Sequence, residues 1–253
     1  MVPDNQTAPP SYPLLPLSHQ KLAREKRFAF IMLVAGALLG VLAGLVFIIW
    51  PALDFYLTDQ LRADGKFILR GEEFWSFTRR FTMWAYGIVY VMMVFGLVHS
   101  LRVRKPVWTL YPTQWFYLVA CSLVGPLLVT NLILKTYIGR PRPRSVTEYG
   151  GSLDFVPVLE AGGKCVENCS FVSGEVSSMV MIFAALMFAS LKWRKVFALL
   201  LFPAWAFSAF LRVGQGAHFP SDTFFAGMFM IVIAAGLYRL IVLSPRNITL
   251  SDQ

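Results

Sequence analysis

Three clusters of charged and polar residues in this 253-residue chain have types and spacings that suit phosphate chemistry. The first cluster contains Lys135 and Arg142, seven residues apart, so on a helix both would lie on one face. Gly139, Pro141 and Pro143 break such a helix. We expect the prolines to fix the guanidinium group of Arg142, although a basic collar at a membrane surface would have a similar composition.

The second cluster is Ser173-Gly174-Glu175, which comes just before a long apolar stretch. Ser170 or Ser173 can cap a helix that begins there. Gly174 would let a backbone N–H approach an oxyanion closely, and a helix N-terminus is itself an anion site. An ordinary helix cap explains the same residues, so this cluster is weak evidence on its own.

The third cluster contains Arg212, His218 and Asp222. His218 and Asp222 are four residues apart, a spacing at which a helical carboxylate can meet an imidazole and orient it. A single histidine is usually structural. A His–Asp pair beside an arginine at the end of an apolar segment indicates function, because ionisable groups in a membrane are costly unless they are paired.

The composition places these clusters in a membrane protein. Hydrophobic residues make up 57% of the chain, charged residues make up 15%, and the mean hydropathy is +0.59. Soluble domains carry about 25% charged residues. These values exclude a disordered chain, a disulfide-rich secreted module and a soluble globule. The net charge of +9 then indicates basic anchors in cytoplasmic loops and a site for an anionic ligand, not a nucleic-acid partner.

Six apolar stretches predict an all-α integral membrane protein with six transmembrane helices. They cover residues 28–50, 81–101, 115–134, 176–191, 196–211 and 223–238. The last three contain only 16 uncharged residues each, fewer than the ~20 that a membrane span needs. Glu175, Arg212 and Asp222 stand at their ends, and helices that begin or end in a polar cavity look short for this reason.

Short basic loops determine the expected orientation, because cytoplasmic loops are rich in Lys and Arg. We expect both termini in the cytoplasm and the three clusters at the outer face of the membrane. The loops outside are then residues 51–80, 135–175 and 212–222. Cys165 and Cys169 lie in the second of these loops and would form a disulfide in an oxidising compartment.

The N-terminal residues are rich in proline and polar side chains and show no periodicity, which is typical of disorder. A basic group of residues then precedes the first apolar stretch. The expected domains are therefore a disordered basic cytoplasmic tail (1–27), a six-helix membrane domain (28–243) and a short cytoplasmic tail (244–253).

In order along the chain, the clusters form Lys-x6-Arg-Pro, Ser-Gly and Arg-x5-His-x3-Asp. This series resembles the three-part signature of the type 2 phosphatidic acid phosphatase family, and six spans with both termini inside resemble its integral-membrane branch. The resemblance implies a lipid phosphatase in which His218 attacks phosphorus and forms a phosphohistidine, while Asp222 orients the ring. It also implies a phosphate site without metal or cofactor, formed by Lys135, Arg142, Ser173, Gly174 and Arg212.

The second cluster departs from the family signature, which usually reads Pro-Ser-Gly-His where this chain has Val172-Ser173-Gly174-Glu175. In the family that histidine is the general acid that protonates the leaving group. Either Glu175 takes this role here or the protein is not a phosphatase. Leu211 also stands where the family often has serine. The segment from Tyr149 to Glu175 resembles a branch found among bacterial lipid A phosphatases.

The expected substrate is a membrane lipid that carries a phosphate, because the clusters lie where helices meet the outer leaflet. Arg140, Arg144 and Lys164 are either headgroup contacts or solvated loop charges, and as contacts they would favour a headgroup with more than one phosphate. Lipid A or a related phosphoglycolipid is preferred. Phosphatidylglycerophosphate, undecaprenyl pyrophosphate and a lipid-to-lipid phosphotransferase stay open. A transporter would need functional charges at both faces and inverted repeats, so it is disfavoured.

Overall fold

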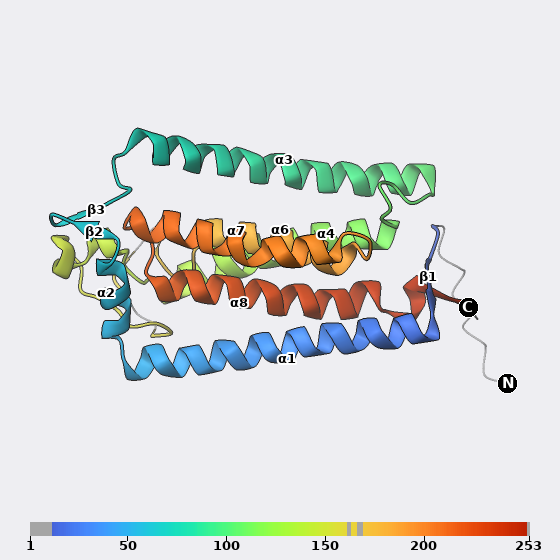
Figure 1. The fold of residues 1–253 in the computed structure, drawn as a ribbon, viewed down its shortest axis with the longest axis horizontal. Coiled ribbons are helices and arrows are strands. Elements are labelled where there is room, and N and C mark those ends of the chain that lie inside the picture. Colours follow the sequence, from blue (N-terminus) through green and yellow to red (C-terminus); the bar gives the residue numbers. More distant parts are fainter. Residues whose placement is uncertain (1–11, 161–162, 166–168, 252–253) are drawn as a thin grey trace.

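The computed structural model describes residues 12–160, 163–165 and 169–251, and it is a bundle of long helices lying side by side (Figure 1). The first two long helices are α1 (His19–Ile49) and α3 (Glu73–Val103). A third is continuous from α4 (Pro112–Ser122) through the π-helical segment η1 (Leu123–Leu134) to α5 (Lys135–Ile138). The bundle is completed by α6 (Gly174–Ala189), α7 (Arg194–Gly214), and α8 (Pro220–Leu237) with its π-helical continuation η4 (Tyr238–Val242).

Five helical segments are long and apolar enough to cross a membrane, and each covers one of the six stretches expected from the sequence. The remaining stretch forms α6, which has 16 residues. At ~1.5 Å per residue α6 is ~24 Å long, shorter than the ~30 Å of a hydrocarbon core. Large apolar side chains such as Leu38, Leu42 and Ile49 of α1 point outward and are more than half exposed. Such a surface suits contact with lipid, not with water.

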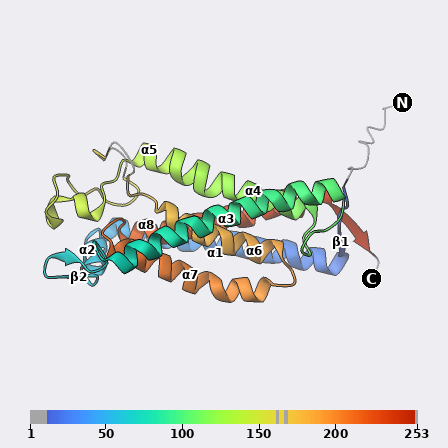
Figure 2. The same cartoon turned by 90° about the horizontal axis from the view of Figure 1, so that it is seen from above.

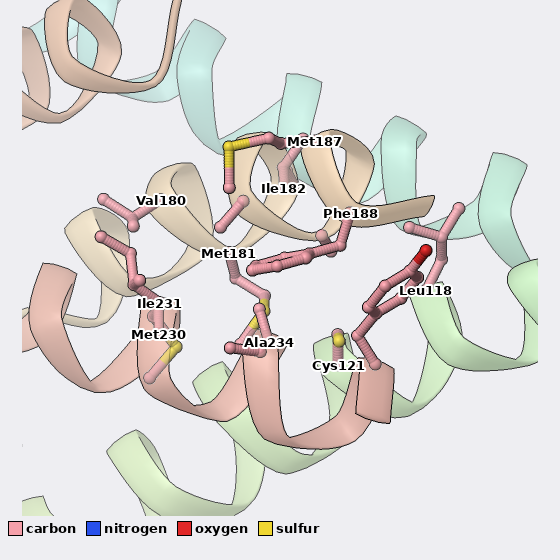
Figure 3. Packing of buried hydrophobic residues seen from close by; sticks show 14 of the residues in the cluster. Leu118, Cys121, Val180, Met181, Ile182, Met187, Phe188, Met230, Ile231 and Ala234 are labelled. Atoms are coloured by element: carbon pink, nitrogen blue, oxygen red, sulfur yellow. The ribbon is translucent and has the colours of Figure 1, made fainter. Parts of the chain in front are cut away.

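The interior of the bundle forms where α6 packs against α4, α7 and α8. Figure 3 shows the apolar side chains that meet there, among them Met181 and Phe188 of α6, Leu118 of α4 and Met230 of α8. A helix that is apolar on all sides belongs in the interior of a bundle. The short helix α6 is therefore enclosed largely by protein.

The segments at the two ends of the described chain pair with each other at one end of the bundle. Strand β1 (Leu15–Ser18) lies parallel to β4 (Ile248–Ser251), with Leu15 opposite Ile248. A short helical turn, η5 (Pro245–Asn247), precedes β4. In Figure 1 this pairing lies at the right, next to the start of α1.

The expected disordered tail is wrong for residues 15–27. Leu15 and Leu17 are buried, and α1 begins at His19, nine residues before the apolar stretch. Ser18 caps the helix by accepting a hydrogen bond from the backbone N–H of Lys21. A capped helix can extend past the membrane with its basic residues in water, so apolarity alone placed its start too late. Residues 1–11 lie outside the described part of the chain.

The opposite end of the bundle carries the short elements (Figure 2). They are α2 (Ala52–Asp59), the hairpin of β2 (Arg62–Ala63) and β3 (Lys66–Phe67), and two helical turns, η2 (Pro143–Ser145) and η3 (Thr147–Tyr149). The end of α5, the N-terminus of α6 and the connection from α7 to α8 also lie there. All three clusters of the sequence are therefore at one end of the molecule.

Candidate active site

Hydrogen bonds between backbone atoms join the three clusters. The N–H of Ser170 donates to the carbonyl of Arg140 (2.7 Å), which ties the segment before α6 to the segment after α5. The N–H of Ser173 donates to the carbonyl of Asp222 (3.4 Å), which ties the start of α6 to α8. A disulfide between Cys165 and Cys169 lies in the same loop. The segment before α6 is thus tied by its backbone to both of the other clusters.

His218 lies in the connection between α7 and α8 and is only 2% exposed. Its Nδ1 atom is 2.7 Å from the carbonyl oxygen of Ser170. A carbonyl can only accept a hydrogen bond, so Nδ1 carries the proton and Nε2 has the free lone pair. Burial lowers the pKa of His218 well below its ordinary value, and the positive charges of Arg212, Arg142 and Lys135 lower it further. The imidazole is therefore neutral, with its lone pair at Nε2.

Asp222 does not bind the imidazole as the sequence predicted. Its Oδ2 atom lies 3.9 Å from Nδ1 of His218, too far for a hydrogen bond. The carboxylate instead accepts hydrogen bonds from the hydroxyl of Ser170 and the backbone N–H of Phe219. Asp222 thus holds Ser170, and the carbonyl of Ser170 holds the ring. The spacing of four residues between His218 and Asp222 could not reveal that Ser170 lies between them, because Ser170 comes from another part of the chain.

Arg140 is neither a headgroup contact nor a solvated loop charge, because its side chain is fully buried. Its guanidinium donates to the carboxylates of Asp222 and Asp54, to the hydroxyl of Ser221 and to the carbonyl of Val156. It is an internal cation that joins α2 to the site. Arg140 therefore supports the site without contacting a substrate headgroup.

Asp54 of α2 is part of this network, and the sequence analysis did not identify it. It is 1% exposed and accepts hydrogen bonds from both the backbone N–H (2.9 Å) and the hydroxyl (2.6 Å) of Ser221. One signal was available in the sequence: Asp54 is a carboxylate within the mostly apolar segment 51–57. Its partner, Arg140, comes 86 residues later, so no local pattern pairs them.

Unsatisfied donors lie at the N-cap of α6 and in the last turn of α7. Within the described part of the chain, the buried hydroxyl of Ser173 and the Nε atom of Arg212 have no hydrogen-bond partner. Buried donors of this kind need a partner, and a phosphate oxygen would supply one. A helix N-terminus adds free N–H groups and the positive end of a dipole. The sequence predicted Ser173 as a donor to phosphate, and in the structure its hydroxyl is buried without a partner among the described residues.

Gly174 lies directly against the lysine of the first cluster. A Cβ atom at this position would be 3.3 Å from Nζ of Lys135 and 3.1 Å from Oδ1 of Asn131. A larger residue would require Lys135 or Asn131 to move by a few tenths of an ångström, so glycine suits this close approach. Lys135, Arg142 and Arg212 all act electrostatically on the imidazole of His218. The structure thus brings together every residue that the sequence assigned to the phosphate site.

Glu175 forms ion pairs with two arginines. Nε of Arg79 donates to Oε1 of Glu175 (2.9 Å), and Nη1 of Arg212 lies 3.4 Å from the same oxygen. Arg79 belongs to α3 and was not identified from the sequence. Its one signal is that Arg79 and Arg80 stand together where an apolar stretch begins. The carboxylate that replaces the family histidine is therefore placed at the edge of the phosphate site.

The two other expected headgroup contacts are separated in the structure. Arg144 lines a polar cavity of about 430 Å³ that also contains Arg142 and Arg212. Lys164 is exposed and pairs with Asp154 at 3.3 Å, and it does not line this cavity. Within the described residues, no three His, Cys, Asp or Glu side chains gather as metal ligands do. Arg142, Arg144 and Arg212 together place positive charge around the cavity.

The comparisons with known proteins agree with these motifs. The model of the PAP2 superfamily matches residues 114–246. Three curated relatives are each named lipid A 4'-phosphatase. The protein of Rhizobium leguminosarum is 33% identical over 60% of this chain and 66% of its own length. The protein of Francisella tularensis subsp. novicida is 28% identical over 82% of this chain and 95% of its own length. The protein of Rhizobium etli is 40% identical over 47% of this chain and 46% of its own length.

The match spans two thirds or less of the two Rhizobium proteins. No solved structure matches the chain significantly. The family model nevertheless covers more than half of the chain, including α6, His218 and Asp222. The resemblance to the type 2 phosphatidic acid phosphatases is thereby confirmed, and this chain belongs to the PAP2 superfamily.

Proposed function

We propose that this protein is a lipid A 4'-phosphatase, which transfers the phosphate monoester of a phosphoglycolipid to water through a phosphohistidine. The observation that carries the proposal is that a buried, neutral imidazole and hydrogen-bond donors without partners occur in one site. His218 has its free lone pair at Nε2, and the unpartnered atoms of Ser173 and Arg212 lie in the same site. The names of the relatives supply the lipid and the phosphate position.

In the first step Nε2 of His218 attacks phosphorus in line with the sugar oxygen. The N–P bond forms as the P–O bond breaks, and the electron pair leaves with the sugar oxygen. Lys135, Arg142 and Arg212 bind the non-bridging oxygens, because phosphoryl transfer depends on fixed positive charge around phosphorus. Each well-placed donor can contribute roughly 2.7–4 kcal/mol of transition-state stabilisation. This set of cations supports a reaction that needs no metal ion.

The departing sugar oxygen needs a proton, and Glu175 is our candidate donor. In the free protein its carboxylate is held by Arg79 and Arg212. A bound phosphate gives these arginines a second anionic partner, which weakens their hold on Glu175. Glu175 then takes a proton from the monoanionic phosphate ester and passes it to the leaving oxygen. In the second step Glu175 takes a proton from water, whose oxygen attacks phosphorus and releases phosphate and His218.

We further propose six membrane spans, with the β1–β4 end in the cytoplasm and the active site in the periplasm of a bacterial inner membrane. The loop between α3 and α4 contains Arg104 and Lys105, and that between α6 and α7 contains Lys192. Short basic loops of this kind favour the cytoplasm. The disulfide of Cys165 and Cys169 supports an oxidising compartment for the opposite end.

The test measures phosphate release from lipid A by purified protein in excess chelator, with wild type compared to His218→Ala. We expect wild-type turnover and a single loss of phosphate by mass spectrometry. His218→Ala should retain less than about a tenth of the activity, because removal of a nucleophile costs far more than that. Strong activity in this variant, or activity that needs added magnesium, contradicts the mechanism. Transfer of label to an added second lipid would make the protein a phosphotransferase.

A further inference from the structure

The polar cavity beside the active site is far more cationic than one phosphate requires. It has a volume of about 430 Å³. Arginines from four parts of the chain line it: Arg70, Arg79, Arg80, Arg142, Arg144 and Arg212. The other lining residues are Leu69, Gly71, Ser76 and Gln215, so no acidic side chain of the described residues lines this cavity. A phosphate monoester carries at most two negative charges.

Three of these arginines are not part of the phosphate site. Among the described residues, the side chains of Arg70, Arg80 and Arg144 form no hydrogen bond or ion pair, whereas Arg79 and Arg212 share Glu175. The positive charges of Arg70 and Arg79 both act on the guanidinium of Arg144. Like charges gathered in this way repel one another, and a bound anion removes that repulsion.

Backbone hydrogen bonds hold the segments of Arg70 and Arg144 in place relative to the connection that carries His218. The N–H of Leu69, next to Arg70, donates to the carbonyl of Gly214 (3.0 Å). The N–H of Arg144 donates to the carbonyl of Gly216 (3.1 Å). Both acceptors lie between Arg212 and His218 in the sequence. The mouth of the cavity is therefore built on the same connection that carries the nucleophile.

Glycines allow this close contact. A Cβ atom at Gly216 would lie 2.6 Å from the ring of Phe67, and one at Gly214 would lie 2.6 Å from the side chain of Leu69. Gly216 also has a φ of +63°, which favours glycine. The hairpin of β2 and β3 is thus seated on the connection from α7 to α8 and presents Arg70 at a fixed position.

We propose that Arg70, Arg80 and Arg144, with Arg79, form a second anion subsite for another phosphate or acidic group on the headgroup whose first phosphate is cleaved. The proposal rests on the phosphatase function proposed above and narrows its substrate to headgroups with at least two anionic groups. The cleaved phosphate lies at Lys135, Arg142 and Arg212. The second group lies farther out and determines which lipid is accepted.

The test compares two substrates that differ in one group: a lipid A disaccharide with phosphates at positions 1 and 4', and the same lipid with the 4'-phosphate alone. Both are assayed in neutral detergent micelles. Arg70→Gln/Arg80→Gln is the main variant, and Arg144→Gln is a second variant on a separate element. Lys66→Gln is the matched control, because Lys66 is an exposed cation of the same hairpin that does not line the cavity.

We expect wild type to prefer the bisphosphorylated lipid in kcat/KM by about tenfold or more, since charge-assisted bonds to phosphate are strong. The double variant should lose most of this preference by slowing on the bisphosphorylated lipid, with less than about a threefold change on the other. Lys66→Gln should match wild type on both.

Equal rates of wild type on the two lipids, or equal losses by the variants on both, overturn the subsite while leaving the phosphatase function in place. Hydrolysis of neither lipid overturns the proposed function and the subsite together. A separate lipid is a second source of the anion, so the monophosphorylated substrate is also assayed with added phosphatidylglycerol. If that lipid restores the full rate in wild type but not in the variants, the subsite binds a neighbouring lipid and the same-headgroup proposal is wrong.

Discussion

At the scale of single residues, the protonation of His218 depends on the fold around it. The ring is buried, and three nearby cations oppose a positive charge on it. In the unfolded chain a histidine has a pKa of about 6.5. The unfolded chain therefore takes up a proton below that pH while the folded protein does not. Stability that is present above pH ~6.5 is then lost as the pH falls toward the depressed pKa of the folded state.

This leads to a prediction for the melting temperature in detergent. Lowering the pH from 7.5 to 5.5 should lower it more in wild type than in His218→Gln, which keeps a polar side chain but cannot titrate. His19 and His99 are present in both proteins and cancel in the comparison. An equal decrease in the two proteins would show that the folded state protonates His218 as readily as the unfolded state does.

Glu175 offers a second residue-scale prediction. Glu175→Gln keeps a hydrogen-bond acceptor for Arg79 but removes the proton donor. We expect turnover of lipid A to fall at least ~100-fold, within the range for loss of a general acid. p-Nitrophenyl phosphate has a leaving group that needs no proton, so its hydrolysis should fall much less. Wild-type rates on both substrates would make Glu175 a structural partner of the arginines, and the acid would have to be another group.

At the scale of elements, two ion pairs with buried carboxylates connect segments at opposite ends of the bundle. Asp54 connects α2 to the site through Arg140. At the other end Glu25 of α1 is 1% exposed and accepts two hydrogen bonds from Arg194 of α7. Tyr238 of η4 donates a third to Glu25. Both carboxylates are 1% exposed, but Arg140 is fully buried whereas the side chain of Arg194 is 20% exposed, and only the first pair contacts residues of the active site.

The two pairs allow a matched comparison. Asp54→Asn should destabilise the protein by about 3–5 kcal/mol, because it leaves the fully buried Arg140 without its full charge partner. Glu25→Gln should destabilise it less, because the side chain of Arg194 is 20% exposed and water can partly solvate its charge. Only Asp54→Asn should also lower kcat per folded molecule, since it loosens Asp222 and Ser170, which hold the imidazole. The amount of folded protein is measured by size-exclusion chromatography. Turnover is measured with p-nitrophenyl phosphate. A normal kcat in Asp54→Asn would restrict Asp54 to stability.

Features that depend on residues close together in the sequence could be predicted, and features that depend on distant residues could not. Apolar stretches predict the helices because lipid contact imposes a continuous local signal. The motif residues Lys135, Ser173 and His218 were found because their types and spacing are local as well. Asp54 and Arg79 were missed, because each acts through a partner far along the chain. The burial of Arg140 was missed for the same reason, since Asp54 and Asp222 are distant in sequence from it.

At the scale of the whole molecule, the proposed orientation gives a labelling prediction. Cys121 is buried and Cys165 is bonded to Cys169, so the background of reactive thiols is low. A cysteine placed at Lys66, in the hairpin, should react with a membrane-impermeant maleimide added to cells with a permeabilised outer membrane. One placed at Arg104, at the opposite end, should react only after lysis. The reverse labelling pattern would show that the proposed orientation is wrong and that the active site faces the cytoplasm.

The parallel pairing of β1 with β4 restricts how many times the chain can cross a membrane. Leu15 and Ile248 are neighbours in one small sheet, so they lie on the same side of any membrane the bundle crosses. A path that leaves a side and returns to it crosses an even number of times. The five long helices give an odd number. In the proposed six-span topology α6 supplies the sixth crossing, and because other helices surround it, its length has to suit the protein around it more than the lipid.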